Sequence, residues 1–416
     1  MLKTNHYFKL LFESRYVFLY TFAERIFFFV VFLIFARTYS TEFYGQLITV
    51  FTISNIAILF FDFGLPILLQ REISIFRKKS SELLSLILFV NIFSFVAYFS
   101  TVYFYCNIFY NDISVLLKVL IILNVYTFFL HNLINRILFA LSKFKAQFII
   151  LFISKLIILI AFILTLVFFQ FGISKELFLL FIGNSVNILF LIFYLHKESA
   201  VFSFKYISID GIKNILKISL PLGAVVIFNF LYDKIDVIII SKLTDFNQVA
   251  YYNIGYGIYK SSVLAFNFFL ISGFSKISYI NEKKYAVKIF FKKYALLTVF
   301  ICLFVFLVFF IGSDFLIKLV FSDKYSPSSI VLKILSFAIF GLALNNLTGI
   351  ILNGLGLYKQ NMVATMTAVI INIVLNLIFI KYYGIIGACI VTIITEYLIF
   401  ALDSYFLVKY LKVKNN

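Results

Sequence analysis

The sequence predicts an all-α polytopic membrane protein, with about twelve transmembrane helices arranged as two pseudo-symmetric bundles of six. Three observations predict this fold class. First, 63% of the 416 residues are hydrophobic and only 13% are charged, whereas a soluble domain is roughly 45–50% apolar and about 25% charged. Second, apolar runs of about 20 residues, long enough to cross a bilayer as a helix, recur along the whole chain. Third, part of the sequence occurs twice.

The repeated part lies in two loops, each following a long apolar run. Residues 137–147 read ILFALSKFKAQ, and residues 351–361 read ILNGLGLYKQN, at an offset of 214. A shorter echo pairs Phe-Gly-Ile at 171–173 with Tyr-Gly-Ile at 383–385, at an offset of 212. A nearly constant offset is typical of a duplicated unit. We therefore predict that residues 1–200 and 201–416 form two six-helix bundles.

The predicted spans, in chain order, are 16–36, 44–69, 82–106, 115–135, 147–169, 177–195, 218–241, 251–273, 294–312, 329–352, 362–380 and 385–408. Helices are preferred to barrel strands because the runs lack the alternating pattern, in segments of about ten residues, that a barrel strand needs. The first run contains Glu24 and Arg25 with no small-residue cleavage site after it, so we expect a span and not a signal peptide. Pro66 and Pro221 predict helix breaks at corresponding positions of the two halves.

The loop charges predict the topology. The loops on the side of the N-terminus carry 24 Lys and Arg residues, against 6 in the opposite loops. Because basic loops stay in the cytoplasm, both termini are expected there. The formal net charge of +18 requires no nucleic-acid partner, since basic loops bind anionic lipids with about 1 kcal/mol per charge. The densest basic segment, 276–293, includes KKYAVKIFFKKYA and predicts a surface helix ahead of the ninth span.

Ionisable residues inside the spans are the candidate functional residues, because each costs at least about 2.5–3.5 kcal/mol at the bilayer centre. The candidate cations are Arg25, Lys155, Lys234 and Lys260, and the candidate carboxylates are Asp62, Glu396 and Asp403. Lys155 and Lys260 have no opposite charge one turn away in their own helices. We therefore expect both to line a polar cavity. The three cysteines lie singly in apolar runs, which predicts no metal or cofactor site.

Structural roles are the alternative for these polar residues. Intramembrane Asn, Ser and Thr more often join helices by hydrogen bonds than contact a substrate. Glu24 with Arg25, or Asp233 with Lys234, are candidates for structural ion pairs. Lys155 and Lys260 would likewise be structural if they extended to the membrane surface or paired with a carboxylate from another helix.

Several segments resemble the Wzx-type flippases of O-antigen and capsule polysaccharide, which belong to the MOP superfamily with the MATE exporters and the lipid II flippase. In the first half they are residues 36–45 (ARTYSTEFYG), 62–66 (DFGLP) and 71–72 (RE). In the second half they are residues 219–221 (SLP), 232–236 (YDKID), 249–252 (VAYY) and 351–359. The resemblance covers nearly the whole chain.

The resemblance implies a MATE-like fold, in which two six-helix bundles form a V around a central cavity. It implies that an undecaprenyl-diphosphate-linked oligosaccharide is turned from the cytoplasmic to the periplasmic leaflet of the bacterial inner membrane, for O-antigen (lipopolysaccharide) or capsule synthesis. Arg25, Lys155, Lys234 and Lys260 would then meet the diphosphate as charge-assisted donors. Asp62, Glu396 and Asp403 would bind the proton or sodium ion that resets the cavity.

The implied partners are the lipid-linked oligosaccharide, the surrounding lipids and the polysaccharide polymerase and chain-length machinery. Asp233 and Asp236 make the expected cavity less positive than a purely cationic one. A MATE-type multidrug antiporter would favour a pocket dominated by carboxylates, and the intramembrane lysines argue against it. A membrane enzyme such as an O-antigen polymerase would need a large outer loop, but the longest one, about residues 313–328, is short and has no nucleophile–base pair. The sequence therefore predicts a transporter and not an enzyme.

Overall fold

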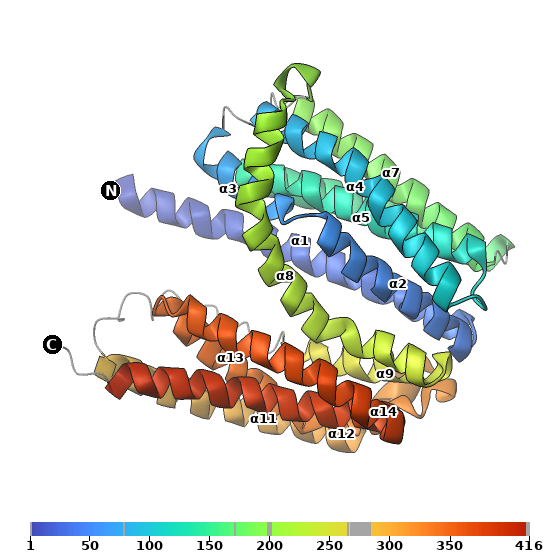
Figure 1. Ribbon diagram of the computed structural model, residues 1–416, viewed down its shortest axis with the longest axis vertical. Coiled ribbons are helices and arrows are strands. Elements are labelled where there is room, and N and C mark those ends of the chain that lie inside the picture. The colour runs from blue at the N-terminus through green and yellow to red at the C-terminus, as the bar shows by residue number, and fades with distance from the viewer. Residues whose placement is uncertain are drawn as a thin grey trace. The chain divides into compact units, whose positions relative to one another are not determined.

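The computed structural model describes residues 2–77, 80–169, 172–197, 202–263, 266 and 284–412, and every regular element within them is a helix. In chain order the α-helices are α1 (Leu2–Thr38), α2 (Thr41–Phe61), α3 (Leu65–Ile75), α4 (Ser80–Phe109), α5 (Val115–Ala140), α6 (Phe144–Leu164), α7 (Ile173–Lys197), α8 (Ile209–Leu243), α9 (Phe246–Ser261), α11 (Lys284–Phe321), α12 (Ser328–Ser336), α13 (Ala338–Gly354) and α14 (Tyr358–Lys412) (Figure 1). A π-helical turn, η2 (Thr165–Phe169), and two 3₁₀ turns, η3 (Phe204–Tyr206) and η4 (Asp323–Tyr325), complete them. The all-α fold class is confirmed.

The number of spans is close to the prediction. Among the described residues, eight helices are long and apolar enough to cross a membrane, or up to ten when the bent α8 and the α12–α13 pair each count as one span. The predicted count of twelve is therefore approximate. The eighth predicted span falls partly on residues 264–265 and 267–273, which lie outside the described residues.

α14 is two helical arms joined by a sharp turn. Gly384 inside it has a non-helical φ of 56°. A straight helix would place Phe379 and Gly387 about 12 Å apart, but a Cβ built on Gly387 would lie 2.3 Å from the carbonyl oxygen of Phe379. Asn372 on the first arm donates to Thr395 on the second at 3.4 Å. The chain therefore turns back at Gly384, and the two arms correspond to the eleventh and twelfth predicted spans.

The longer sequence repeat is also a repeat of backbone structure. Ser142 and Gly356, which are 214 positions apart, have positive φ angles of 59° and 77°. Each follows a helix end closed by the same two bonds: Ser142 N to Phe139 O and Lys143 N to Leu138 O in the first copy, and Gly356 N to Asn353 O and Leu357 N to Leu352 O in the second. This pair of bonds is the Schellman motif. The shorter echo is not kept in the same way, because Gly384 has a positive φ and Gly172 does not; Phe171 lies outside the described residues.

The helices fall into two compact units. The first contains the residues up to Phe35 together with Val50–Ile227. Its central helix is α5, which packs against α3, α4, α6 and α7. Hydrogen bonds tie α5 to its neighbours: Tyr98 donates to the carbonyl of Ile122 at 3.3 Å, and Asn124 donates to that of Leu177 at 2.8 Å. Such bonds join helices where an apolar surrounding offers no water.

The predicted break in the second span lies in this first unit, between α2 and α3. Phe63 and Gly64 both have positive φ angles, and Asp62 Oδ1 accepts a bond from Gly64 N at 2.6 Å. A Cβ on Gly64 would lie 2.4 Å from the backbone nitrogen of Gly223 in α8, so the backbone of this turn lies directly against the backbone of α8. α8 contains Pro221 and bends by 43°. The predicted break at Pro66 is confirmed. α8 continues through Pro221 and bends between Ala224 and Val226, about one turn later.

The second unit contains Ala36–Thr49 and the residues from Phe228 onward. Its helix α12 packs against α9, α11 and α14, and α13 packs against α14. The boundary between the units thus falls inside α8, and the segment Ala36–Thr49 belongs to the second unit. The division into duplicated bundles at 1–200 and 201–416 stays a prediction.

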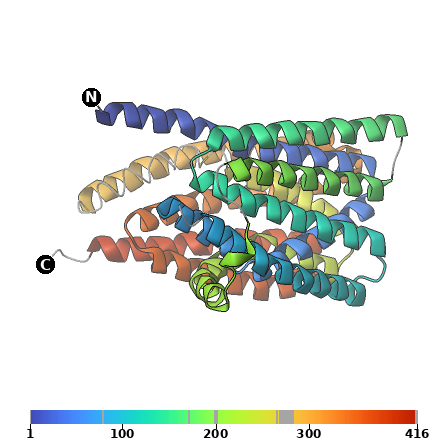
Figure 2. The same cartoon turned by 90° about the horizontal axis from the view of Figure 1, so that it is seen from above.

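The ninth span differs from the expectation at its start. α11 runs without interruption from Lys284 to Phe321, and its first turns are the light-orange helix in Figure 2. The prediction of a separate surface helix is therefore wrong for residues 284–295, because their apolar side chains continue directly into the span. Residues 276–283 of the basic segment lie outside the described residues.

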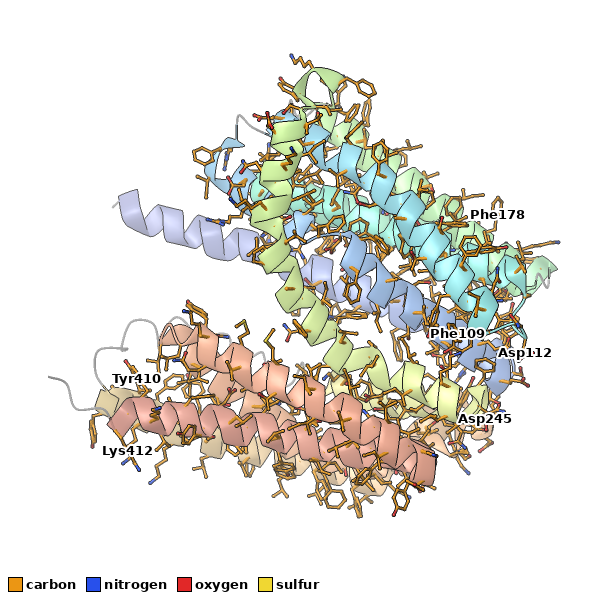
Figure 3. All side chains as sticks on the ribbon, viewed as in Figure 1. Phe109, Asp112, Phe178, Asp245, Tyr410 and Lys412 are labelled. Carbon is orange, nitrogen blue, oxygen red and sulfur yellow. The ribbon has the colours of Figure 1, made fainter. Side chains whose placement is uncertain are left out.

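The outer faces of the helices are apolar. On α11, Leu296, Phe300 and Ile311 expose 75%, 73% and 73% of their surface, and Phe109 and Phe178 on other helices are also exposed (Figure 3). A surface this apolar is unsuited to water and matches hydrocarbon. The chain is a multi-pass membrane protein.

Candidate functional site

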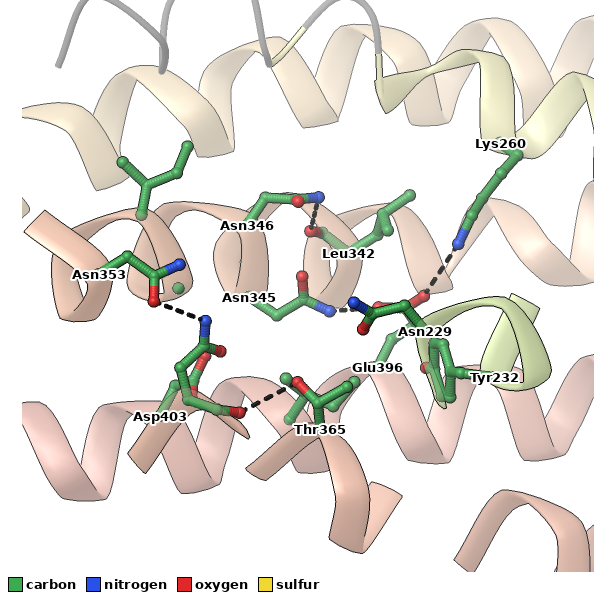
Figure 4. A pocket seen from close by; sticks show the side chains of 14 residues that line it. Asn229, Tyr232, Lys260, Leu342, Asn345, Asn346, Asn353, Thr365, Glu396 and Asp403 are labelled. Carbon is green, nitrogen blue, oxygen red and sulfur yellow. Dashed lines mark hydrogen bonds and ion pairs between the residues drawn. The ribbon is translucent and has the colours of Figure 1, made fainter. Parts of the chain in front are cut away.

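Polar side chains in the second unit surround a cavity of about 280 Å³. α8, α9, α13 and α14 contribute its lining (Figure 4). Five of the lining residues are asparagines: Asn229, Asn345, Asn346, Asn353 and Asn361. The ionisable lining residues include Lys260, Glu396 and Asp403. Three of the seven predicted candidates are thus brought together at one cavity.

Lys260 lies between two carboxylates from other helices. Its Nζ is 2.8 Å from Asp233 Oδ1 on α8 and 3.9 Å from Glu396 Oε1 on α14. The rings of Tyr232 and Tyr256 lie 5.9 Å and 5.6 Å from the same nitrogen, within cation–π range. From the sequence, only residues of the same helix could be examined as partners of Lys260. Its partners therefore appear only in the tertiary structure.

Lys234 is a second predicted cation that lies near this network. Its Nζ is 3.9 Å from Asp233 Oδ2, and its side chain is 30% exposed. Asp233 therefore faces both Lys234 and Lys260. Neighbouring Asp233 and Lys234 form the structural pair that the sequence offers as an alternative, although the shorter contact of Asp233 is with Lys260.

Glu396 and Asp403 are fully buried on the second arm of α14. Glu396 accepts a hydrogen bond from the Asn345 amide and another from the Tyr259 hydroxyl at 3.4 Å. Asp403 Oδ2 accepts from the Thr348 hydroxyl at 3.4 Å. Asp403 Oδ1 is buried with no hydrogen-bond partner among the described residues. A buried carboxylate oxygen without a partner is costly.

A second polar cluster in the same unit holds helices together. Asp236 accepts from the Tyr252 hydroxyl at 2.6 Å and from the Asn376 amide at 2.8 Å. Asn376 also donates to Asn372 at 3.0 Å. Both carboxylate oxygens of Asp236 are thus occupied by groups from α9 and α14. This arrangement agrees with the structural role expected for most intramembrane amides.

The remaining three candidates belong to the first unit. Lys155 is 3% exposed; its Nζ donates to Asn184 Oδ1 at 2.6 Å and lies 4.6 Å from the ring of Phe27. Arg25 is exposed on α1. Asp62 stabilises the α2–α3 turn through its bond to Gly64, which supplies a structural reason for its position. The assignments of all seven candidates to the diphosphate or a coupling ion stay predictions.

Sequence reasoning missed three polar lining residues: Asn353, Asn361 and Thr365. Asn361 donates to Asn353 at 3.1 Å, and Thr365 donates to the backbone oxygen of Asn361 at 3.0 Å. They lie at the end of α13 and the start of α14, where polar residues are expected at any helix end. The one signal in the sequence was that Asn353 and Asn361 fall within the repeated segment.

The sequence matches the polysaccharide biosynthesis protein family over residues 13–274 and the MatE family over residues 221–378. No curated protein matches it. The fold is similar to a lipid II flippase MurJ in an inward closed conformation, with a TM-score of 0.65 and 16% identity over 93% of this chain and 94% of that one.

Two solved MATE transporters are also similar. An inward-facing multidrug resistance MATE family transporter of the MOP superfamily has a TM-score of 0.71 and 14% identity, over 94% of each chain. A point mutant of the Vibrio cholerae MATE transporter VcmN has a TM-score of 0.60 and 14% identity, over 98% of this chain and 97% of that one. At such identities the likeness shows the fold, while the first family match covers more than half of the sequence. The chain therefore belongs to the polysaccharide biosynthesis protein family and has the fold of the MOP-superfamily flippases and transporters.

Proposed function

We propose that this membrane transporter turns an undecaprenyl-diphosphate-linked oligosaccharide from the cytoplasmic to the periplasmic leaflet of the bacterial inner membrane, for O-antigen or capsule synthesis. The family match over residues 13–274 supports a role in polysaccharide synthesis. The observation that carries the proposal is the polar cavity among apolar helices in the second unit. Buried polar groups are costly in a membrane and mark the path of a polar substrate.

The substrate has three chemically different parts, and they need different surroundings. The diphosphate needs cations, for which Arg25, Lys155, Lys234 and Lys260 are the candidates. Of these, Lys155 is bonded to a neutral amide and has one carboxylate, Glu24, acting on it. Lys260 has two, so of these two lysines Lys155 keeps the stronger attraction for an anion. The sugars need hydrogen-bonding groups, and the polyprenyl tail can stay in the lipid beside the exposed apolar helix faces.

Resetting the cavity requires an energy source, and we assign it to a proton or a sodium ion bound by buried carboxylates. Asp403 has one oxygen without a partner among the described residues. Glu396 contacts Lys260 and Asn345. Both are placed where a change of charge would alter the contacts between α9, α13 and α14. Asp62 is the third candidate for this role, although its bond to Gly64 already occupies one oxygen.

A MATE-type multidrug antiporter is the second candidate function. The MatE match over residues 221–378 and the two carboxylates at the cavity favour it. The two functions differ in what a deletion strain loses: surface polysaccharide in one case, and resistance to lipophilic cations in the other.

The test is complementation of the host strain that lacks this gene, scored as surface polysaccharide beside an immunoblot of the membrane fraction. We expect the wild type to restore polysaccharide, and Lys155→Ala to restore less at equal protein level. Lys155→Arg should recover part of the loss. Arginine keeps the positive charge, although its planar guanidinium differs in shape from the lysine ammonium. Lys333→Ala is the matched control, since the Lys333 side chain is 36% exposed and pairs with Asp314 at 2.5 Å. Full polysaccharide with Lys155→Ala would remove the support for the cation assignment.

A further inference from the structure

The cavity of the second unit has a lining dominated by amides. Each asparagine side chain offers two donors and one acceptor oxygen, and five of them face one cavity of about 280 Å³. Sugar hydroxyls both donate and accept, so amides match them better than charges do. Binding pockets for small molecules usually measure roughly 300–1,000 Å³, and this cavity lies at the small end. We infer that it holds one neutral sugar ring of the transported oligosaccharide; this inference rests on the proposed function.

The charges at the cavity disfavour the diphosphate as its occupant, so Lys260 is a weaker candidate for the diphosphate than Lys155. Lys260 is the one cation among the lining residues. Its charge is already opposed by Asp233 at 2.8 Å and Glu396 at 3.9 Å. Asp403 adds a further carboxylate at the other end. An anion would therefore meet net repulsion, and the same argument excludes a uronic acid from the preferred sugars.

The polarity of the lining also disfavours a lipophilic cation. Tyr232 is the one aromatic residue among the lining residues. A lipophilic cation has no hydrogen-bonding groups, so its binding would take water from the amide groups that have no partner in the protein, which costs free energy for each group. A sugar ring replaces those lost water contacts.

The position of the ring follows from Gly349 on α13. A Cβ built on Gly349 would lie 3.5 Å from Asn361 Oδ1 and 3.8 Å from Asp403 Oδ2. The missing side chain therefore leaves open the space between these two polar groups. Asn361 uses one donor on Asn353, and Asp403 Oδ2 accepts from Thr348 at 3.4 Å with room for a second donor. The space over Gly349 fits one hydroxyl of the ring, which would lie beside Asn361 and Asp403 Oδ2.

The first test is saturation-transfer NMR on the purified full chain in phosphatidylcholine nanodiscs. The probes are N-acetyl-D-glucosamine, D-galactose, D-glucuronate and tetraphenylphosphonium. We expect transfer to at least one of the two neutral sugars and its loss for D-glucuronate. Transfer to tetraphenylphosphonium alone, or to no sugar, would overturn the inference.

The second test uses variants that change the cavity but not the fold. Gly349→Leu should abolish transfer to the sugar by filling the space, and Gly349→Ala should keep the chain folded, since its Cβ contacts are ordinary ones. Thr365→Val and Thr367→Val form a matched pair: each loses a hydroxyl bonded to its own helix, at 3.0 Å and 2.8 Å. Both residues are half-buried, but Thr365 lines the cavity and Thr367 does not. Loss of transfer with Thr365→Val alone supports the inference, and equal losses contradict it.

Complementation of the host deletion strain separates this inference from the proposed function. If the wild type restores polysaccharide while Gly349→Leu leaves sugar transfer unchanged, the sugar site is wrong and the function stands. If the wild type fails to restore polysaccharide while Gly349→Leu abolishes sugar transfer, the site stands and the proposed function is wrong.

Discussion

Individual lysines in this protein differ more than their sequence neighbourhoods indicate. Lys155 and Lys260 both lack an acidic partner in their own helices, yet one bonds to a neutral amide and the other lies between two carboxylates. Removing Lys260 would leave Asp233 and Glu396 close to each other without an opposing charge from α9. Removing Lys155 would leave the acceptor of Asn184 open and take away one of the positive charges that act on Glu24 of α1.

At the residue scale we therefore predict that Lys260→Ala lowers the melting temperature of the purified protein more than Lys155→Ala does. The double variant Lys260→Ala, Asp233→Ala should recover part of the loss, because the pair is coupled by roughly 0.5–3 kcal/mol. Thermal unfolding of the wild type, the single variants and the double variant in detergent measures this coupling. Additive losses in the double variant would show that the interaction between Lys260 and Asp233 does not contribute to stability.

A short segment between α1 and α2 is hydrogen-bonded to the end of α11 and to η4. It lies within residues 36–45, which carry the family resemblance. Arg37 donates to the carbonyls of Val320 and Leu319, Lys324 donates to that of Tyr39, and Tyr325 donates to that of Ala36. Burial lowers the pKa of Lys324. Its amino group is the donor in the bonds to these backbone oxygens.

At the element scale we predict that Gly45→Ala prevents normal folding. A Cβ there would lie 1.8 Å from the carbonyl oxygen of Phe246, which is backbone and cannot rotate away. Gly257→Ala on α9 is the control: a Cβ there has nothing within 4 Å, and alanine in a helix gains about 0.5–1 kcal/mol over glycine. Size-exclusion profiles and melting temperatures of the two variants test this. Equal behaviour would mean that α2 and α9 do not approach so closely.

A second prediction at this scale uses the repeated loop. Ser142 has a φ of 59° where its counterpart is Gly356, and a left-handed conformation costs a non-glycine residue roughly 1–2 kcal/mol. Ser142→Gly should therefore raise the melting temperature, and Gly356→Ser should lower it by a similar amount. Changes of the same sign in both variants would contradict the equivalence of the two loops.

The whole molecule is predicted to have an even number of spans, with both termini in the cytoplasm. The basis is the distribution of 24 against 6 basic residues between the two sets of loops. The turn at Gly384 would then face the periplasm. Single cysteines introduced near residues 384 and 416 should react with an impermeant maleimide in intact spheroplasts only at the first position. The three native cysteines are all buried, so they give little background. Labelling at residue 416 would reverse the topology.

The sequence by itself determined the fold class, most helix positions and the break between α2 and α3. It could do so because a bilayer admits only helices or closed barrels, which makes length and hydrophobicity sufficient evidence. The equivalence of Ser142 and Gly356 was also readable, since a helix end depends on local residues. Each of these properties is decided within one segment of chain.

The tertiary structure alone decided which polar residues meet. Lys260 finds its carboxylates on α8 and α14, Gly349 opens the space between Asn361 and Asp403, and residues 36–49 belong to the second unit. None of these follows from one helix, because the period of a helix shows which residues share a face but not which other helix that face contacts. Contacts between helices depend on how all of them pack together, and the sequence pattern of each helix is compatible with many such packings.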